Sequence, residues 1–221
     1  MAALFDFHIH SHLSFDSFQR PEKILRQAQR RGLRGLAITD HNRFGLDLAS
    51  LSEGFPDLLL IPGMEIGTEI GDVLVLFLKE EIRTRNFREV AEKAKEQEAL
   101  LVLAHPFKRG CGPYGEEIMK EIHAVEVRNG QNRANWEEAG ELARKWGKPA
   151  LAGSDAHFLS QIGSTYTLLP EVGSLAEVKE AILRGETEVA GEGLPAWWAL
   201  PSRLTGIIKR IFGKKRRNVP A

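Results

Sequence analysis

The sequence is poor in the features that mark secreted and membrane proteins. Its single cysteine, Cys111, cannot form an internal disulfide, and this cysteine content suits a reducing compartment. No run of about 18 apolar residues occurs, which excludes a membrane-spanning helix. Residues 1–7 contain no basic and apolar leader, so we expect no cleaved signal peptide and a cytoplasmic location.

Two kinds of catalytic site are also unsupported. The chain has no G-x-x-x-x-G-K-[S/T] sequence, which argues against a phosphate-binding loop of that kind. Cys111 lies in a glycine-rich stretch, but nothing indicates a histidine and an asparagine that would activate its thiol. With 43% hydrophobic and 27% charged residues, the 221 positions fit one medium-sized globular domain.

The net charge of zero conceals an uneven distribution. Lys and Arg number 30, as do Asp and Glu, yet seven basic residues and no acid lie from Arg203 onward. The zero total therefore leaves a formal charge of −7 on residues 1–202. We expect a domain over residues 1–195 and a basic tail over residues 196–221.

The tail has the pattern of an amphipathic helix. Apolar residues recur every three or four positions, at Leu204, Ile207, Ile208, Ile211 and Phe212. Such a helix either docks on the domain or binds an anionic partner. The partner would be a membrane surface, where each basic residue contributes about 1 kcal/mol, or nucleic acid, contacted through its phosphates.

Seven short runs rich in branched aliphatic residues predict strands. Their continuous apolar character is typical of a parallel sheet covered on both faces. The runs are Leu4–His8, Leu36–Thr39, Leu58–Ile61, Val73–Phe77, Leu100–Ala104, Ala124–Val127 and Ala150–Ala152.

Helical patterns fall between these strands, at Pro21–Arg31, Asn86–Glu98 and Asn132–Trp146. Strands that alternate with helices predict an α/β barrel, with an open doubly wound sheet as the alternative. Gly71 and Asp72, close after Glu65, predict that one connection is a hairpin instead of a helix.

Six of the seven histidines lie in or just after the ends of predicted strands. The first strand ends Asp6-Phe7-His8-Ile9-His10, and side chains two apart on a strand face the same side. Four other strands end in Thr39-Asp40-His41, Gly63-Met64-Glu65, Ala104-His105-Pro106 and Ser154-Asp155-Ala156-His157. In an α/β barrel the carboxyl ends of the strands converge on the face that carries the active site.

Taken singly, each of these residues fits a buried histidine or a helix-capping acid. Taken together, they would leave unpaired polar groups that cost several kcal/mol each unless a ligand joined them. Imidazole and carboxylate donors without thiolate suit Zn²⁺, Mn²⁺ or Fe²⁺. Because the donors are many, we expect two or three divalent ions bridged by a carboxylate.

These strand-end signatures, in this order over about residues 4–160, resemble those of the PHP (polymerase and histidinol phosphatase) family. The resemblance implies a distorted seven-stranded, TIM-like (β/α) barrel with two or three metal ions that hydrolyse phosphoesters. Around one ion it places His8, His10, Glu65 and Asp155. It implies that Glu65 bridges to a second ion held by His105. To a third ion it assigns Asp16, His41 and His157.

Two departures from the family pattern concern the second ion and the substrate. Many members carry a further histidine on the strand after the bridging glutamate, and residues 72–75 contain none. Either Asp72 substitutes, or the second ion relies on Glu65, His105 and solvent. Many nucleotide-acting relatives also carry a large insertion, whereas only 39 residues separate Glu65 from His105 here. We therefore do not assign the substrate of any relative to this chain.

The expected chemistry needs a nucleophile and cations. A metal-bound water has its pKa lowered from 15.7 to about 7, and the resulting hydroxide would attack a polarised phosphoryl group. We assign catalytic roles to Glu65 and Asp155, and to Asp40 as a residue that orients His41 or a neighbouring ligand. Cations for the phosphate oxygens follow predicted strands and are Arg43, Lys108, Arg109 and Arg128, with Arg109 and Arg128 preferred.

The remaining polar residues have weaker cases. Glu126 and Asn129 lie near Arg128 in the sequence and are further candidates for the site. His12 is two residues after His10, as His10 is after His8, but it falls in the loop that follows the strand. His123 precedes a strand and fits a structural role.

These observations predict a metal-dependent phosphoesterase that acts on a small phosphorylated metabolite, a nucleotide or an oligonucleotide end. One alternative is a non-catalytic metal-binding module that recruits a partner through its basic tail. A metal-dependent amide hydrolase on a related barrel is the other. Metal content and hydrolysis of an aryl phosphate would separate a phosphoesterase from a non-catalytic module.

Overall fold

The computed structural model describes residues 2–194, without the side chain of Arg109. The tail over residues 196–221 and its expected helix lie outside the described residues. None of the helices within residues 2–194 combines the length and the apolar character needed to cross a bilayer.

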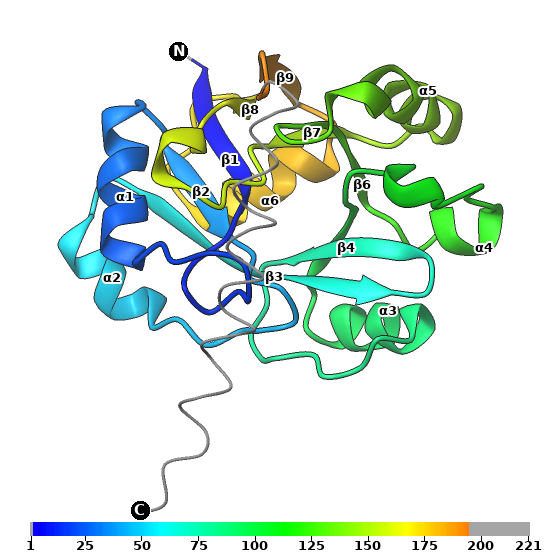
Figure 1. Ribbon diagram of the computed structural model, residues 1–221, viewed down its shortest axis with the longest axis horizontal. Helices are drawn as coiled ribbons and strands as arrows, with labels where there is room; N and C mark the ends of the chain where they lie inside the picture. Colours follow the sequence, from blue (N-terminus) through cyan, green and yellow to red (C-terminus); the bar gives the residue numbers. More distant parts are fainter. Residues whose placement is uncertain (1, 195–221) are drawn as a thin grey trace, which may run out of the picture.

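The described chain folds around one twisted sheet of nine strands (Figure 1). Their order across the sheet is β7-β6-β5-β4-β3-β2-β1-β8-β9. The strands are β1 (Ala3–Ile9), β2 (Gly35–Ile38), β3 (Leu59–Thr68), β4 (Gly71–Leu76), β5 (Leu100–Leu103), β6 (Ala124–Asn129), β7 (Ala150–Gly153), β8 (Thr165–Leu169) and β9 (Glu188–Gly191). All seven predicted strands are present, and β8 and β9 are two more than the seven-stranded barrel expected from the sequence.

The sheet curls into a nearly closed barrel. Just after β7, the Ala156 N–H and carbonyl pair with β1, through the His8 carbonyl and the His10 N–H. Hydroxyl groups of β8 also reach β7, where Thr167 Oγ1 accepts from the Ala152 N–H at 2.8 Å. The open doubly wound sheet is therefore excluded.

The sheet contains two groups of three parallel strands, separated by the antiparallel strand β4 and followed by the antiparallel strands β8 and β9. β1, β2 and β3 run parallel, as do β5, β6 and β7, whereas β4 is antiparallel to both β3 and β5. Only Glu69 and Ile70 separate β3 from β4, so the predicted hairpin is confirmed. The turn needs Gly71, whose φ of +121° is in the region that favours glycine.

Six helices join the strands: α1 (Pro21–Arg30), α2 (Leu48–Gly54), α3 (Phe87–Glu96), α4 (Glu116–Met119), α5 (Trp136–Trp146) and α6 (Leu175–Leu183). In Figure 1, α1 and α2 lie on one side of the barrel and α3, α4 and α5 on the other. The helix α1 begins at Pro21, which suits a first helical turn. The helix α5 starts later than expected, because residues 133–135 form a single 3₁₀ turn, and it ends at Gly147 with φ +58°.

Apolar side chains fill the barrel below the carboxyl ends of its parallel strands. This interior cluster takes members from β1 to β8, among them Phe5, Phe7, Leu74, Leu76 and Leu151. Val178 and Ile182 of α6 join it. The polar strand ends therefore rest on a packed apolar floor.

Candidate metal centre

His8 and His10 are fully buried on β1 and just after it, and both present Nε2 to the same two carboxylates. His8 Nε2 lies 3.4 Å from Glu65 Oε2 and 3.7 Å from Asp155 Oδ1. His10 Nε2 lies 3.5 Å and 3.1 Å from the same two oxygens. The alternation along β1 therefore has the consequence expected from the sequence, and both imidazoles face one space.

Gly153, the last residue of β7, allows β7 to approach His8. A Cβ atom at this position would overlap His8 Cβ and would lie 2.9 Å from Glu126 Oε1. Only glycine fits here, and its small size brings the following Asp155 up to the two histidines.

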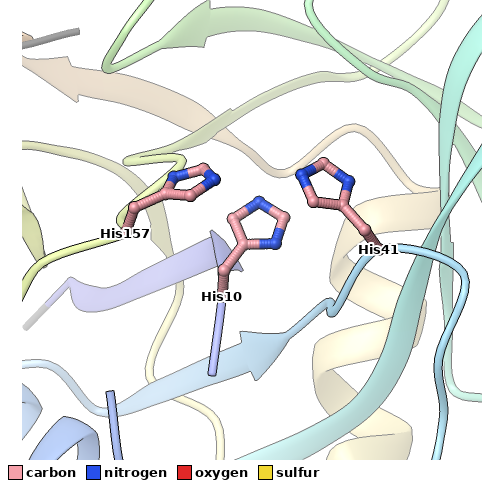
Figure 2. A group of neighbouring side chains, drawn as sticks. All are labelled: His10, His41 and His157. Carbon is pink, nitrogen blue, oxygen red and sulfur yellow. The ribbon is translucent and has the colours of Figure 1, made fainter. Parts of the chain in front are cut away.

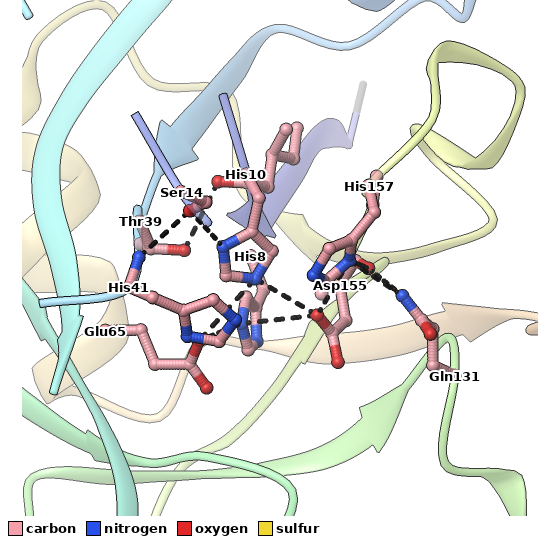
Figure 3. Close-up of polar contacts among 12 residues, drawn as sticks. His8, His10, Ser14, Thr39, His41, Glu65, Gln131, Asp155 and His157 are labelled. Atoms are coloured by element: carbon pink, nitrogen blue, oxygen red, sulfur yellow. Dashed lines mark hydrogen bonds and ion pairs between the residues drawn. The ribbon is translucent and has the colours of Figure 1, made fainter. Parts of the chain in front are cut away.

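Glu65 lies at the centre of the cluster. Its backbone forms an isolated bridge with His41, which places His41 Nδ1 2.7 Å from Glu65 Oε2. On the other side, Glu65 Oε1 lies 3.0 Å from His105 Nε2. This buried carboxylate thus contacts four imidazoles from three segments, which suits a ligand shared between ions; Figure 3 shows it beside His8, His10 and His41.

Asp16 comes from the loop after β1 and lies between two further histidines. Asp16 Oδ2 is 3.3 Å from His41 Nε2 and 3.1 Å from His157 Nε2. His10, His41 and His157 also offer ligand atoms within 4.8 Å of one another, and Figure 2 shows their rings converging. The structure therefore brings together all eight residues predicted to bind metal: His8, His10, Asp16, His41, Glu65, His105, Asp155 and His157.

The hydrogen bonds of His8 show that this cluster needs a cation. His8 Nδ1 lies 2.9 Å from Glu126 Oε1, and because an ionised carboxylate only accepts, Nδ1 carries the proton. Burial opposes ionisation of His8, but the Glu126, Asp155 and Glu65 carboxylates raise its pKa well above the usual range, so a second proton occupies Nε2 when no ion is bound. In the neutral ring, His8 Nε2 carries a lone pair that faces two carboxylate oxygens. Within residues 2–194, the buried His8 Nε2 has no hydrogen-bond partner, and Glu65 Oε2 is in contact with His41 Nδ1 as an ion pair. Acceptors that face one another in a buried space require a cation.

The pKa values indicate the same need for positive charge. Burial opposes ionisation of His41 and Glu65, but their mutual attraction raises the pKa of His41 to about 10 and holds that of Glu65 well below its usual range. Burial, together with the charges of His157 and His41, lowers the pKa of His10 to about 3. Protons supply the positive charge in this state, and bound divalent ions would replace them.

Asp40 holds the loop that carries Asp16 and does not face the carboxylates. Its Oδ1 accepts from the Ser11 N–H at 2.7 Å and from Ser14 Oγ at 2.6 Å. Ser14 Oγ in turn lies 3.1 Å from His10 Nδ1 and accepts from the His41 N–H. Asp40 therefore reaches two histidines of the cluster through Ser14.

The predicted cations take different positions. Lys108 Nζ lies 3.5 Å from Asp155 Oδ2, at the edge of the cluster. Arg128 instead donates to the Gly191 carbonyl and stacks over Trp136, and Arg43 is exposed in the loop after His41. The preference for Arg109 rests on a side chain outside the described part of the chain.

Several contributors were missed or undervalued at the level of sequence. Glu126 contacts His8 and also accepts from the His105 N–H at 2.7 Å, so one carboxylate orients two histidines. Glu126 lies two residues before Arg128 on a predicted strand, and this position was only weak evidence for a role in the site. Ser14 and Gln131, the latter 2.9 Å from His157 Nδ1, lie in loops and gave no signal.

A buried cluster of histidines and carboxylates at the strand ends of an α/β barrel defines the class of metal-binding barrel proteins. A family model described as PHP-associated matches residues 132–187. The uncharacterized protein MJ1587 of Methanocaldococcus jannaschii is 35% identical over 142 residues, which cover 58% of this chain and 82% of that protein.

Two solved structures share the fold. A two-domain protein of Bacteroides vulgatus, described as containing a predicted PHP-like metal-dependent phosphoesterase, has a TM-score of 0.70 and 23% identity over 87% of this chain and 65% of its own. An amidohydrolase of Chromobacterium violaceum, with bound sulfate and no metal, has a TM-score of 0.59 and 15% identity over 91% and 97%. The chain belongs to the PHP family, as its strand-end signatures indicated.

Proposed function

We propose that the protein is a metal-dependent phosphoesterase that hydrolyses a small phosphorylated metabolite, a nucleotide or an oligonucleotide end. The observation that carries the proposal is the buried atom His8 Nε2, which has no hydrogen-bond partner within residues 2–194 and lies 3.4 Å from Glu65 Oε2 and 3.7 Å from Asp155 Oδ1. An imidazole lone pair that faces carboxylates in a buried space needs a cation, and imidazole and carboxylate donors suit Zn²⁺, Mn²⁺ or Fe²⁺.

The residues divide between holding ions and holding substrate. Divalent ions, when bound, polarise phosphoryl oxygens and lower the pKa of water to about 7. Glu65 would hold neighbouring ions at a fixed separation, and Glu126 keeps the His8 proton on Nδ1, away from the ligand atom. Lys108, at the edge of the cluster, would neutralise a phosphate oxygen beside Asp155.

The test begins with protein stripped by a chelator and reloaded separately with Mn²⁺, Fe²⁺ or Zn²⁺. Hydrolysis of an aryl phosphate, then of a panel of phosphorylated metabolites and short oligonucleotides, is measured against Glu65→Gln. We expect turnover that depends on the ion and is lost in Glu65→Gln. Glu92→Gln, an exposed change on α3, serves as the control and should retain full activity.

The main alternative is a non-catalytic module, and the same experiment tests it. Stoichiometric metal binding without turnover for any of the three ions would favour the module. Turnover of amides without turnover of phosphate esters would favour the amide hydrolase instead.

For the basic tail over residues 196–221 we retain the proposal of an anionic partner. Binding of the full chain to anionic lipid vesicles and to an oligonucleotide, compared with neutral vesicles, would test it. A tail that recruits such a partner should bind one of them in a salt-dependent way.

A further inference from the structure

The second ion of the family pattern has two evident donors in this chain. Glu65 Oε1, from the second half of β3, and His105 Nε2, from just after β5, lie 3.0 Å apart. The histidine that many members add from the next strand is missing from residues 72–75. A third protein ligand for the second ion would therefore have to come from another residue of β4.

The register of the β3–β4 hairpin decides which residues of β4 face the cluster. Asp72, Leu74 and Leu76 pair directly with Gly67, Glu65 and Gly63, so their side chains share the inner face of the barrel with Glu65. Leu74 and Leu76 are buried members of the apolar interior cluster. Within β4, which the structure describes in full, Asp72 is the inward-facing residue that can donate to a metal.

The position of Asp72 along β4 is also suitable. Because β4 is antiparallel to β3, it begins beside the last residues of β3 (Figure 1). Its first residues therefore lie at the face of the barrel where the parallel strands end. Thr68 Oγ1 donates to the Gly71 carbonyl at 2.6 Å and fixes the turn just before Asp72. Opposite lies Gly67, where an added Cβ would come within 3.3 Å of Asp72 Oδ1. The glycine leaves room for the carboxylate.

His105 lies at distances from both carboxylates that one ion can bridge. Asp72 Oδ2 lies 3.8 Å from His105 Nε2, and Glu65, Asp72 and His105 offer ligand atoms within 4.8 Å of one another. Two atoms that each lie about 2.1 Å from one ion are between about 3 and 4.2 Å apart. The observed 3.0 Å and 3.8 Å fall within this range.

We propose that Asp72 is the third protein ligand of the second ion, in place of the missing histidine. This inference rests on the metal dependence proposed above. The resulting position has two carboxylates and one imidazole, whereas the position formed by His10, His41 and His157 is rich in nitrogen. A position rich in oxygen donors suits Mn²⁺ better than a position rich in nitrogen does, and the Asp72 side chain is 31% exposed, so solvent can reach this position.

The experiment counts ions directly. Chelator-stripped wild type, Asp72→Asn and Asp72→His are titrated with Mn²⁺ by calorimetry, and bound Mn²⁺ is followed by electron paramagnetic resonance. Asp72→Asn keeps the shape of the side chain and removes its charge. We expect it to lose one equivalent of Mn²⁺ or to bind that equivalent at least tenfold more weakly. Asp72→His should restore the equivalent and shift its preference toward Zn²⁺.

Controls separate this inference from the proposed function. Glu92→Gln should bind Mn²⁺ as wild type does, and circular dichroism checks that each variant is folded. Unchanged Mn²⁺ stoichiometry and affinity in Asp72→Asn would overturn the assignment of Asp72, whatever the activity. Wild-type protein that binds the ions but hydrolyses no phosphate ester would overturn the proposed function and leave Asp72 as a ligand. Wild-type protein that binds none of Mn²⁺, Fe²⁺ and Zn²⁺ would overturn both.

Discussion

The closeness of β7 to β1 depends on a single residue, Gly153. A side chain at this position would push against His8 and the Glu126 carboxylate. We expect Gly153→Ala to destabilise the stripped protein by about 1–3 kcal/mol, because the two strands must move apart. Metal affinity should fall as well, since Asp155 follows Gly153 and would move with it. Urea unfolding and a metal titration measure the two effects.

Gly140 provides a matched control for this substitution. It lies inside α5, where an added Cβ would meet nothing closer than Arg144 Nη1 at 3.7 Å. Gly140→Ala should therefore stabilise the protein by up to about 1 kcal/mol. If both alanine variants had equal stability, the close approach at Gly153 would not be a constraint.

Glu126 acts on the metal centre without needing to touch an ion. It keeps the proton of His8 on Nδ1 and also accepts the His105 N–H. Glu126→Gln should weaken metal binding by about 10–100-fold, the range found when a partner of a metal-binding histidine is removed. Competition with a chromogenic chelator measures the change, with Glu92→Gln as the exposed control. Wild-type affinity in Glu126→Gln would contradict this role.

At the level of secondary-structure elements, the closure of the barrel depends on β8. Thr167 Oγ1 accepts the Ala152 N–H of β7, and Thr165 Oγ1 donates to the Gly153 carbonyl. Thr167→Val keeps the shape of the side chain but leaves a buried N–H unpaired, which should cost about 1–3 kcal/mol. Thr167→Ser keeps the hydroxyl and should cost less. Urea unfolding of the two variants tests this, and equal stabilities would show that the hydroxyl is unimportant.

The same threonines explain why two strands were missed from the sequence. Inside the barrel, β8 presents Thr165 and Thr167 and bonds through hydroxyl groups, so it lacks the continuous apolar run by which β1–β7 were recognised. The strand β9 is short and half-buried. Apolar character identifies strands covered on both faces and is silent about strands at an edge.

The hairpin, in contrast, could be predicted, because its cause is local. A glycine with φ +121° follows a two-residue loop, and this need is visible in the sequence. The orientation of Arg128 could not be predicted in this way. The pairing of β6 with β7 shifts register between Glu126 and Arg128, so strict alternation fails there, and Arg128 contacts Trp136 instead.

At the scale of the whole molecule, the convergence of the candidate metal ligands was predictable because topology, and not local contact, brings them together. Donors as far apart in sequence as His8 and His157 meet because parallel strands end on one face of the barrel. The orienting residues Ser14 and Gln131 depend on how individual loops close, which periodicity does not describe. Residue type and strand order thus indicated which side chains converge, while the residues that orient them required the structure.

The assembled centre also predicts a coupling between metal binding and protons. With a pKa of about 10, His41 is protonated at pH 7.5 in the absence of ions, whereas His10, with a pKa of about 3, is already neutral. A metal ligand must be unprotonated, so binding at His41 releases a proton and the affinity should rise as pH increases toward 10. No such contribution is expected from His10.

Calorimetric titration of stripped protein at pH 7.5, in buffers of different ionisation enthalpy, measures this release. We expect the observed heat to depend on the buffer and to indicate net release of protons. His41→Asn should release fewer protons, because the group that holds the proton is gone. Heats that are independent of the buffer would mean that the stripped centre carries no displaceable proton, and the buried carboxylates would then need another source of positive charge.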